Sequence, residues 1–285
     1  MKAKKTRYSI FRYQLLPNES SYQTTLFQTP ISKDELIEKK NDYFKTAITN
    51  EKNNYKGKGT RILAKVEYVN DQDILLKVGV EKSKEINKPD FKKETIKDYP
   101  NIDIYVDNRK NKQFLIIENN LDAFSDSITV MNMLKKAWGE KMSEYRLSLY
   151  IEQTFNENEF WDTIKFYEDR GITAIKFEFI KPNISDISGQ IKKVLNVVGN
   201  DLNGHMINVD VTAPVNGHLE NIKEGNPIIE SFLSYNKEGG GKPPLIKVKG
   251  IRSNIKTIKS EKTFEIDEFN GSSEDLIELF KAATK

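Results

Sequence analysis

The chain has 285 residues, of which 37% are hydrophobic and 31% are charged, and this balance is typical of a folded globular protein. It contains no cysteine, which excludes a disulfide framework, cysteine-ligated zinc, iron–sulfur clusters and thiol nucleophiles. Its 45 basic and 42 acidic side chains give a net charge of +3, so the chain as a whole is not the polycation expected of a DNA-coating protein.

The first part of the sequence predicts strands and one helix. The helix is indicated by a capping box of Ser32 and Glu35 in front of apolar residues at helical spacing. The strands are indicated by alternation of polar and apolar residues between turn signals, whereas the charged stretch 81–100 predicts a surface loop. In chain order we expect a strand at 7–16 at the edge of the sheet or early in it, a helix at 33–49, a hairpin of 62–68 with 74–80, and a hairpin of 102–106 with 114–117.

From residue 125 onward the pattern alternates between helices and strands. Asn226 and Pro227 are typical of a helix start, and the glycines at 239–241 end that helix. The expected helices lie at 125–142, 157–170, 185–198, 227–238 and 273–283, and the expected strands lie at 145–151, 173–180 and 206–211. Three short strands at 245–252, 254–259 and 263–267 are expected to form a meander.

These elements predict an α+β fold of two lobes, residues 1–153 and 154–285, each with a mostly antiparallel sheet covered by helices. Hairpin signals outnumber strand–helix–strand crossovers, and the helix–strand pattern starts again after Gln153. No apolar run approaches the roughly 20 residues that span a bilayer. The N-terminus also lacks the apolar core of a secretory signal. We therefore expect a cytoplasmic protein without a membrane partner.

Basic charge is concentrated at the two ends of the chain. Residues 1–12 hold five basic residues and no acidic one, and residues 242–262 hold seven basic residues against Glu261 alone. A sheet with a lysine-rich face can contact phosphates, although a solvated outer face predicts the same lysines, and the segment has no aromatic platform for base stacking. The candidate nucleic-acid-binding residues are Lys242, Lys247, Lys249, Arg252, Lys256 and Lys259.

The glycines at 239–241 followed by Lys242 form a glycine-rich loop that is not a P-loop. A P-loop needs a preceding strand, four residues between its glycines, and Ser or Thr after the lysine. One interpretation is that the glycines end a helix. The other is that bare glycine amides let a phosphate backbone come close.

Two further groups of residues have a possible chemical role. His205 and His218 each follow an Asn-Gly pair, which favours tight turns but leaves a metal or acid–base role open. Asp103, Asp107 and Glu118 lie on one hairpin, as in metal-dependent nucleases, but Asn120 stands where such a site needs a lysine. A solvated hairpin tip is the alternative. We assign no catalytic residue, metal ligand or cofactor from the sequence.

Three segments carry a resemblance to a known group of proteins: 7–13, 177–183 and 235–241. Their order resembles uncharacterised bacterial proteins found in phage-defence loci. The resemblance implies an intracellular role in antiviral defence and carries no catalytic residues. The expected function is therefore a defence-associated protein that binds nucleic acid through its basic C-terminal meander and basic N-terminus. A protein-interaction subunit with a protein partner or a homo-oligomeric state is the alternative, and a metal-dependent nuclease is the third possibility.

Overall fold

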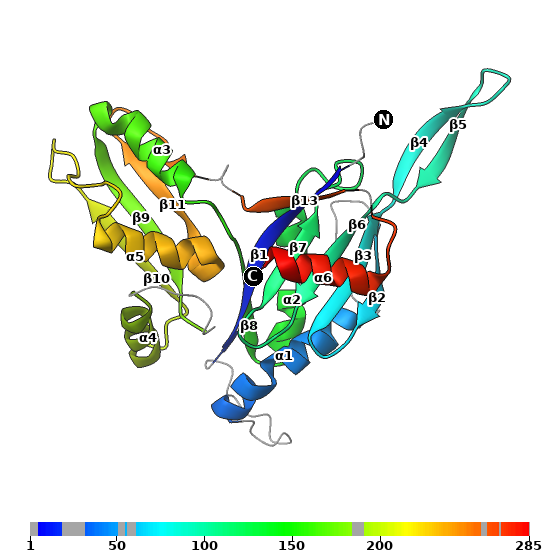
Figure 1. Cartoon of the computed structure of the whole chain (residues 1–285), viewed down its shortest axis with the longest axis horizontal. Helices are drawn as coiled ribbons and strands as arrows, with labels where there is room; N and C mark the ends of the chain where they lie inside the picture. The colour runs from blue at the N-terminus through cyan, green and yellow to red at the C-terminus, as the bar shows by residue number, and fades with distance from the viewer. Residues whose placement is uncertain are drawn as a thin grey trace. The chain divides into compact units, whose positions relative to one another are not determined.

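A computed structural model describes residues 5–18, 32–50, 55, 61–183, 191–257, 261–267 and 269–284 (Figure 1). These residues form an α+β fold with antiparallel sheets covered by helices, as expected. Grouping by contacts gives two compact units. Unit 1 takes the described residues of Met1–Ser9, Leu15–Leu149 and Thr263–Lys285, and unit 2 takes those of Ile10–Gln14 and Tyr150–Lys262.

Unit 1 is built on a seven-stranded sheet in the order β13-β1-β7-β6-β3-β2, with β8 also paired to β1. The strands of this sheet are β1 (Lys5–Pro17), β2 (Ile62–Val69), β3 (Asp73–Val80), β6 (Asn101–Asp107), β7 (Phe114–Glu118), β8 (Leu147–Gln153) and β13 (Thr263–Asp267). The middle of β1, Ile10–Gln14, and the end of β8 from Tyr150 are grouped with unit 2. β1 has neighbours on both sides and is buried from Tyr8 onward, so of the two expected positions, at the edge of the sheet or early in it, the edge is wrong. Apolar residues lie on both of its faces, among the buried polar residues Ser9, Arg12 and Gln14, which is typical of a strand covered on both faces.

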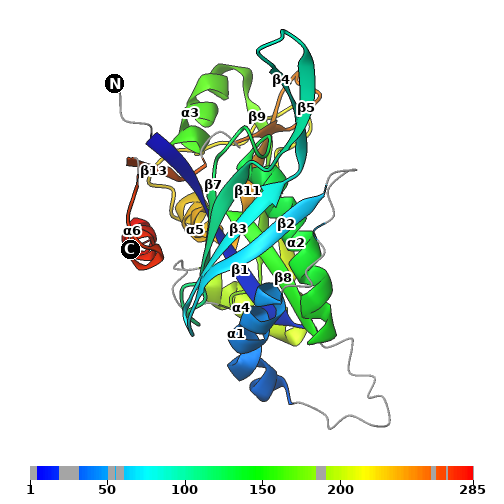
Figure 2. The same cartoon turned by 90° about the vertical axis from the view of Figure 1, so that its right-hand side faces the viewer.

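Helices cover both faces of this sheet (Figure 2). Tyr8, Leu75, Tyr105 and Ile116 point to one face and pack against α6 (Ser273–Ala283). On the other face lie α1 (Lys33–Thr49) and α2 (Ser127–Glu144), whose Phe44 and Trp138 rings meet edge to face at 5.6 Å. The predicted limits of α1 and α6 are confirmed. The Ser32 side chain accepts a hydrogen bond from the Glu35 amide, and Ser272 and Asp275 cap α6 reciprocally.

The stretch expected to be a loop is a two-stranded arm. β4 (Lys82–Asn87) and β5 (Lys93–Asp98) pair with each other and extend away from the seven-stranded sheet (Figures 1 and 2). Every residue of both strands is exposed, so neither face shows the apolar alternation by which strands are recognised in a sequence. Backbone pairing joins the two strands along their whole length, and cross-strand ion pairs such as Lys93–Glu85, at 2.8 Å, add to it.

Unit 2 contains a four-stranded antiparallel sheet in the order β10-β9-β11-β12. Its strands are β9 (Ile172–Ile180), β10 (Met206–Thr212), β11 (Gly241–Val248) and β12 (Ile255–Lys256), and its helices are α3 (Asn158–Tyr167), α4 (Ile191–Asp201) and α5 (Pro227–Tyr235). One face of the sheet packs Phe177, Phe179 and Ile246 against the helices. The residues between these point to the opposite face, which is largely polar and partly exposed. The part of the predicted helix 185–198 that precedes Ile191 lies outside the described residues.

The expected meander is limited to β11 and β12. The third strand, β13, pairs with β1 in the other sheet, with Lys5 opposite Asp267 and Tyr8 opposite Phe264. The rings of Tyr8 and Phe264 also stack at 5.4 Å. Residues from Thr263 onward therefore belong to unit 1, whereas the expected division between residues 153 and 154 places them in the second lobe. None of the helices within the described ranges is long and apolar enough to cross a membrane.

Candidate functional site

The glycine-rich loop of residues 239–241 is buried against other residues of the chain, which leave no room for a ligand at its glycines. Gly239 has φ +83°, and a Cβ there would lie 2.5 Å from the Cβ of Arg12. A Cβ on Gly241 would lie 1.9 Å from the carbonyl oxygen of Glu178. All three glycines are buried, so the interpretation that their amides meet a phosphate backbone is wrong. They let α5 pass through one π-turn (Asn236–Gly240) directly into β11.

The two histidines lie at opposite ends of β10. Asn203 and Asn216 have φ values of 51° and 63°, as expected of the tight turns that precede each histidine. His205 precedes β10, and its Nδ1 lies 3.1 Å from the hydroxyl of Tyr150. His218 follows β10 and lies beside Gly171. A seven-residue strand spans roughly 20 Å, so the two rings do not form one site.

The carboxylates of the candidate nuclease site have other partners. Asp103 lies 3.5 Å from Lys77, and its amide donates to Glu118 at 2.8 Å. Burial raises the pKa of Asp103, which Lys77 partly offsets. Asp107 lies four residues further along β6, roughly 13 Å away, and binds Arg109. Within the described ranges, no group of three His, Asp or Glu side chains could hold a metal ion.

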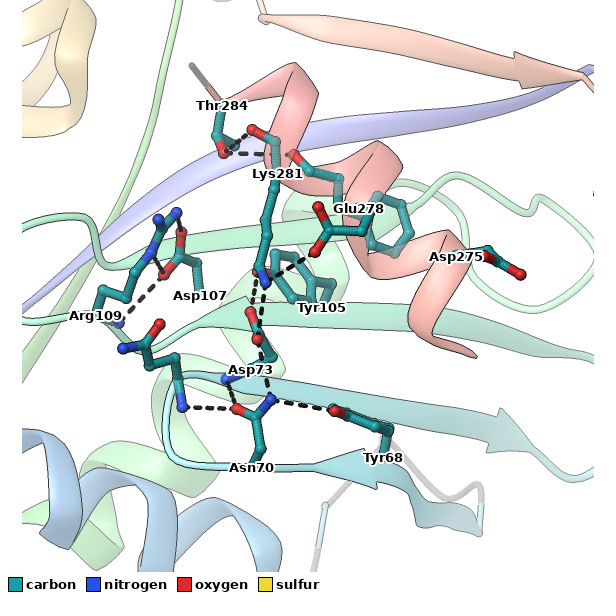
Figure 3. Close-up of polar contacts among 12 residues, drawn as sticks. Tyr68, Asn70, Asp73, Tyr105, Asp107, Arg109, Asp275, Glu278, Lys281 and Thr284 are labelled. Atoms are coloured by element: carbon teal, nitrogen blue, oxygen red, sulfur yellow. Dashed lines mark hydrogen bonds and ion pairs between the residues drawn. The ribbon is translucent and has the colours of Figure 1, made fainter. Parts of the chain in front are cut away.

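Unit 1 contains a polar network that the sequence did not reveal (Figure 3). The buried carboxylate of Asp73 accepts from the Tyr105 hydroxyl at 2.7 Å and lies 3.0 Å from Nζ of Lys281. Burial alone would raise the pKa of Asp73, but hydrogen bonds from Tyr105, Lys281 and Asn70 outweigh it and lower that pKa. Because Lys281 lies on α6 and Asp73 on β3, this ion pair attaches the helix to the sheet. The network is therefore part of the fold.

Unit 2 contains an open cavity of about 620 Å³ whose lining residues include Lys247, Lys249 and Arg252. We call it the basic cavity. The outer face of the sheet contributes Ala174 and Thr212, and a loop of residues 213–217 and the Lys249–Gly250 turn complete the lining. All three cationic residues are exposed, and no carboxylate is among the described residues that line the cavity.

The register of the sheet explains why Lys247 lacks an acidic neighbour across the strands. Lys242 stands opposite Glu178 on β9, whereas Lys247 stands opposite Ala174. One row between them, Lys176 stands opposite Asp210 of β10. Opposite charges therefore meet on most of the outer face, and positive charge remains at the end where the basic cavity lies.

Not all of the predicted nucleic-acid-binding residues line the basic cavity. Lys242 forms an ion pair of 2.6 Å with Glu178, and this bond raises the pKa of the lysine. Lys256 is exposed on the same face as Lys247 and does not line the basic cavity. Lys259 lies outside the described residues. At the N-terminus Arg12 is buried, so the expectation that it contributes to a nucleic-acid surface is wrong.

Other cavities in the part of the chain that the structure describes are less suited to an anion. A cavity of about 560 Å³ in unit 2 is lined by Glu157, Glu224 and Glu230, with Lys237 bound to Glu157 at 3.0 Å. A cavity of about 360 Å³ in unit 1 lies between α1 and β2 and is lined by Arg61 and Lys65 among mostly apolar residues. Neither places three cations together without an acid.

Comparisons with known proteins add no family to this description. No protein-family model matches the chain, and neither curated proteins nor solved structures gave a match.

Proposed function

We propose that unit 2 binds nucleic acid by its phosphates at the basic cavity. The observation that supports this is the meeting of Lys247, Lys249 and Arg252 around one cavity that has no carboxylate in its described lining. Lysine and arginine contacts to phosphate supply most of the sequence-independent affinity of proteins for nucleic acid. An exposed cation with an acidic partner contributes less, because that partner must be displaced.

The described lining of the cavity contains no aromatic side chain. Apart from contacts to phosphates, proteins usually hold single-stranded nucleic acid by stacking its bases on aromatic rings. We therefore propose binding that depends on charge and little on base sequence. The phage-defence role that the sequence resemblance implies is part of the same proposal, and its support is the three resembling segments alone.

The proposal is tested by neutralising the cavity. A variant with Lys247→Gln, Lys249→Gln and Arg252→Gln is compared with the parent in titrations with single-stranded DNA, single-stranded RNA and duplex DNA at several salt concentrations. Up to three phosphate contacts give a slope of log affinity against log salt of at most about −2 for single strands and about −3 for duplex DNA. We expect the variant to lose most of this slope and at least ten-fold in affinity at low salt.

A matched control separates the cavity from net charge. Lys165→Gln, Lys193→Gln and Lys223→Gln remove three exposed cations of unit 2 that do not line the cavity. We expect this variant to bind within about two-fold of the parent. Both variants should melt within a few degrees of it, because exposed charges contribute little to stability. Equal binding by all three proteins, or by none, would contradict the proposal. The arm, whose Phe91 is 93% exposed, would then favour a protein-interaction function.

A further inference from the structure

The basic cavity is small for the number of charges that surround it. Pockets of roughly 300–1,000 Å³ hold one small molecule, so a cavity of about 620 Å³ has room for one nucleotide and its phosphate. In an extended groove each cation could meet a different phosphate of the backbone. Here Lys247, Lys249 and Arg252 all line one cavity, which is an arrangement that suits a single phosphate group rather than a row of them.

The number of charges distinguishes two kinds of phosphate. A phosphodiester inside a strand carries one negative charge, whereas a phosphate monoester carries about −1.5 to −2 at pH 7. A monoester also has three terminal oxygens, which lets the planar guanidinium of Arg252 bind two of them while a lysine binds the third. A single diester would leave most of the positive charge of the cavity without an anion.

We infer that the basic cavity is a site for a phosphate monoester, as found at the end of a nucleic-acid strand or on a free nucleotide. This inference rests on the proposed function and names the ligand of the same site. Thr212 and Asn216 also line the cavity and offer a hydroxyl and an amide as donors to phosphate oxygens. The described lining contains no aromatic ring on which a base could stack, so the identity of the base has little effect on binding.

The experiment compares one ten-nucleotide DNA strand with a 5′-phosphate and with a 5′-hydroxyl, together with adenosine and cytidine 5′-monophosphate as competitors. We expect the phosphorylated strand to bind roughly ten-fold more tightly, as an added charge-assisted hydrogen-bonding group does. The two nucleotides should compete within about two-fold of each other. Arg252→Gln should reduce the preference for the 5′-phosphate to below about two-fold. Lys256→Gln, outside the cavity, should weaken both strands equally and keep the preference.

Each outcome separates this inference from the proposed function. Equal binding of the two strands, with loss of both in the triple variant, would overturn the monoester site and leave nucleic-acid binding intact. Competition by the nucleotides without any binding of the strands would support the monoester site and overturn nucleic-acid binding. If neither the strands nor the nucleotides bind, both fall.

Discussion

The two ends of β11 are composed of similar residues and lie in opposite environments. Each end has glycine beside lysine: Gly241 and Lys242 at the start, and Lys249 and Gly250 just after the strand. At the start, Gly241 is buried and Lys242 is bound to Glu178 at 2.6 Å. At the other end, Gly250 has open space around its Cα, and Lys249 is exposed beside the basic cavity. The first end therefore serves the fold, and the second is free to bind a ligand.

The difference lies in what each residue meets across the sheet. Lys242 faces a glutamate and Lys247 faces an alanine on the same strand, β9. Directly opposite residues of an antiparallel pair are in contact, so the cross-strand neighbour decides whether a lysine is neutralised. A basic segment is thus a poor guide to a binding surface until its register is known.

The buried end of β11 at Gly241 and Lys242, called the closed end, should be the most sensitive to substitution. Gly241→Ala would place a Cβ 1.9 Å from the Glu178 carbonyl oxygen, and that backbone cannot move without breaking the pairing of β9 with β11. We expect a loss of at least ~3 kcal/mol of stability, or no folded protein, because overpacking against backbone has no side chain to yield. Urea unfolding followed by circular dichroism measures it.

Two glycines serve as controls for that substitution. Gly139 lies within α2 with nothing within 4 Å of an added Cβ, so Gly139→Ala should raise stability by up to ~1 kcal/mol. Gly250 also has open space, but its φ of +78° makes Gly250→Ala cost about 1 kcal/mol. A Gly241→Ala protein as stable as the parent would show that the start of β11 is not closed as described.

The other end of β11, beside the basic cavity and called the open end, can be given the acidic neighbour that the closed end has. Ala174→Glu places a carboxylate directly opposite Lys247, as Glu178 stands opposite Lys242. We expect affinity for single-stranded DNA to fall roughly five- to ten-fold at low salt and the salt slope to become shallower by about one contact. Ala174→Gln is the control for size. If it weakens binding as much as Ala174→Glu does, the glutamate acts by filling the cavity and the electrostatic explanation is wrong.

Local signals in the sequence were enough for most elements and for part of the site. The limits of α1 and α6 follow from capping residues, and Asn226 accepts hydrogen bonds from the first amides of α5 as expected. Lys247, Lys249 and Arg252 were identified as candidates from charge alone, and the structure places all three around one cavity. These features depend on neighbours a few residues away.

The features that the sequence missed depend on distant neighbours. The glycine loop is buried by Arg12 and Glu178, which are distant from it in sequence. Lys281 likewise forms its ion pair with Asp73, which lies far earlier in the chain. β13 pairs with β1, and no local pattern in the sequence predicts that pairing. The arm was missed for a different reason, because both of its faces are polar and exposed.

The smallest effect is expected from opening the closed end. Glu178→Gln removes the charge that holds Lys242, so the pKa of Lys242 should fall towards its ordinary value. The lysine lies on the same face as Lys247 and could then reach a phosphate. We expect affinity for single-stranded DNA to rise about two- to three-fold and the salt slope to steepen by at most one contact. The loss of a partly exposed ion pair should cost no more than ~1 kcal/mol of stability.

The double variant Glu178→Gln with Lys242→Gln decides between two explanations of that rise. If the freed lysine contacts phosphate, the double variant returns to the affinity of the parent. If the rise persists in the double variant, the lost carboxylate acted by repelling the ligand and Lys242 makes no contact. If Glu178→Gln alone leaves binding unchanged, phosphate contacts are confined to the basic cavity, and the contrast between the two ends of β11 reflects distance from the ligand rather than pairing of charge.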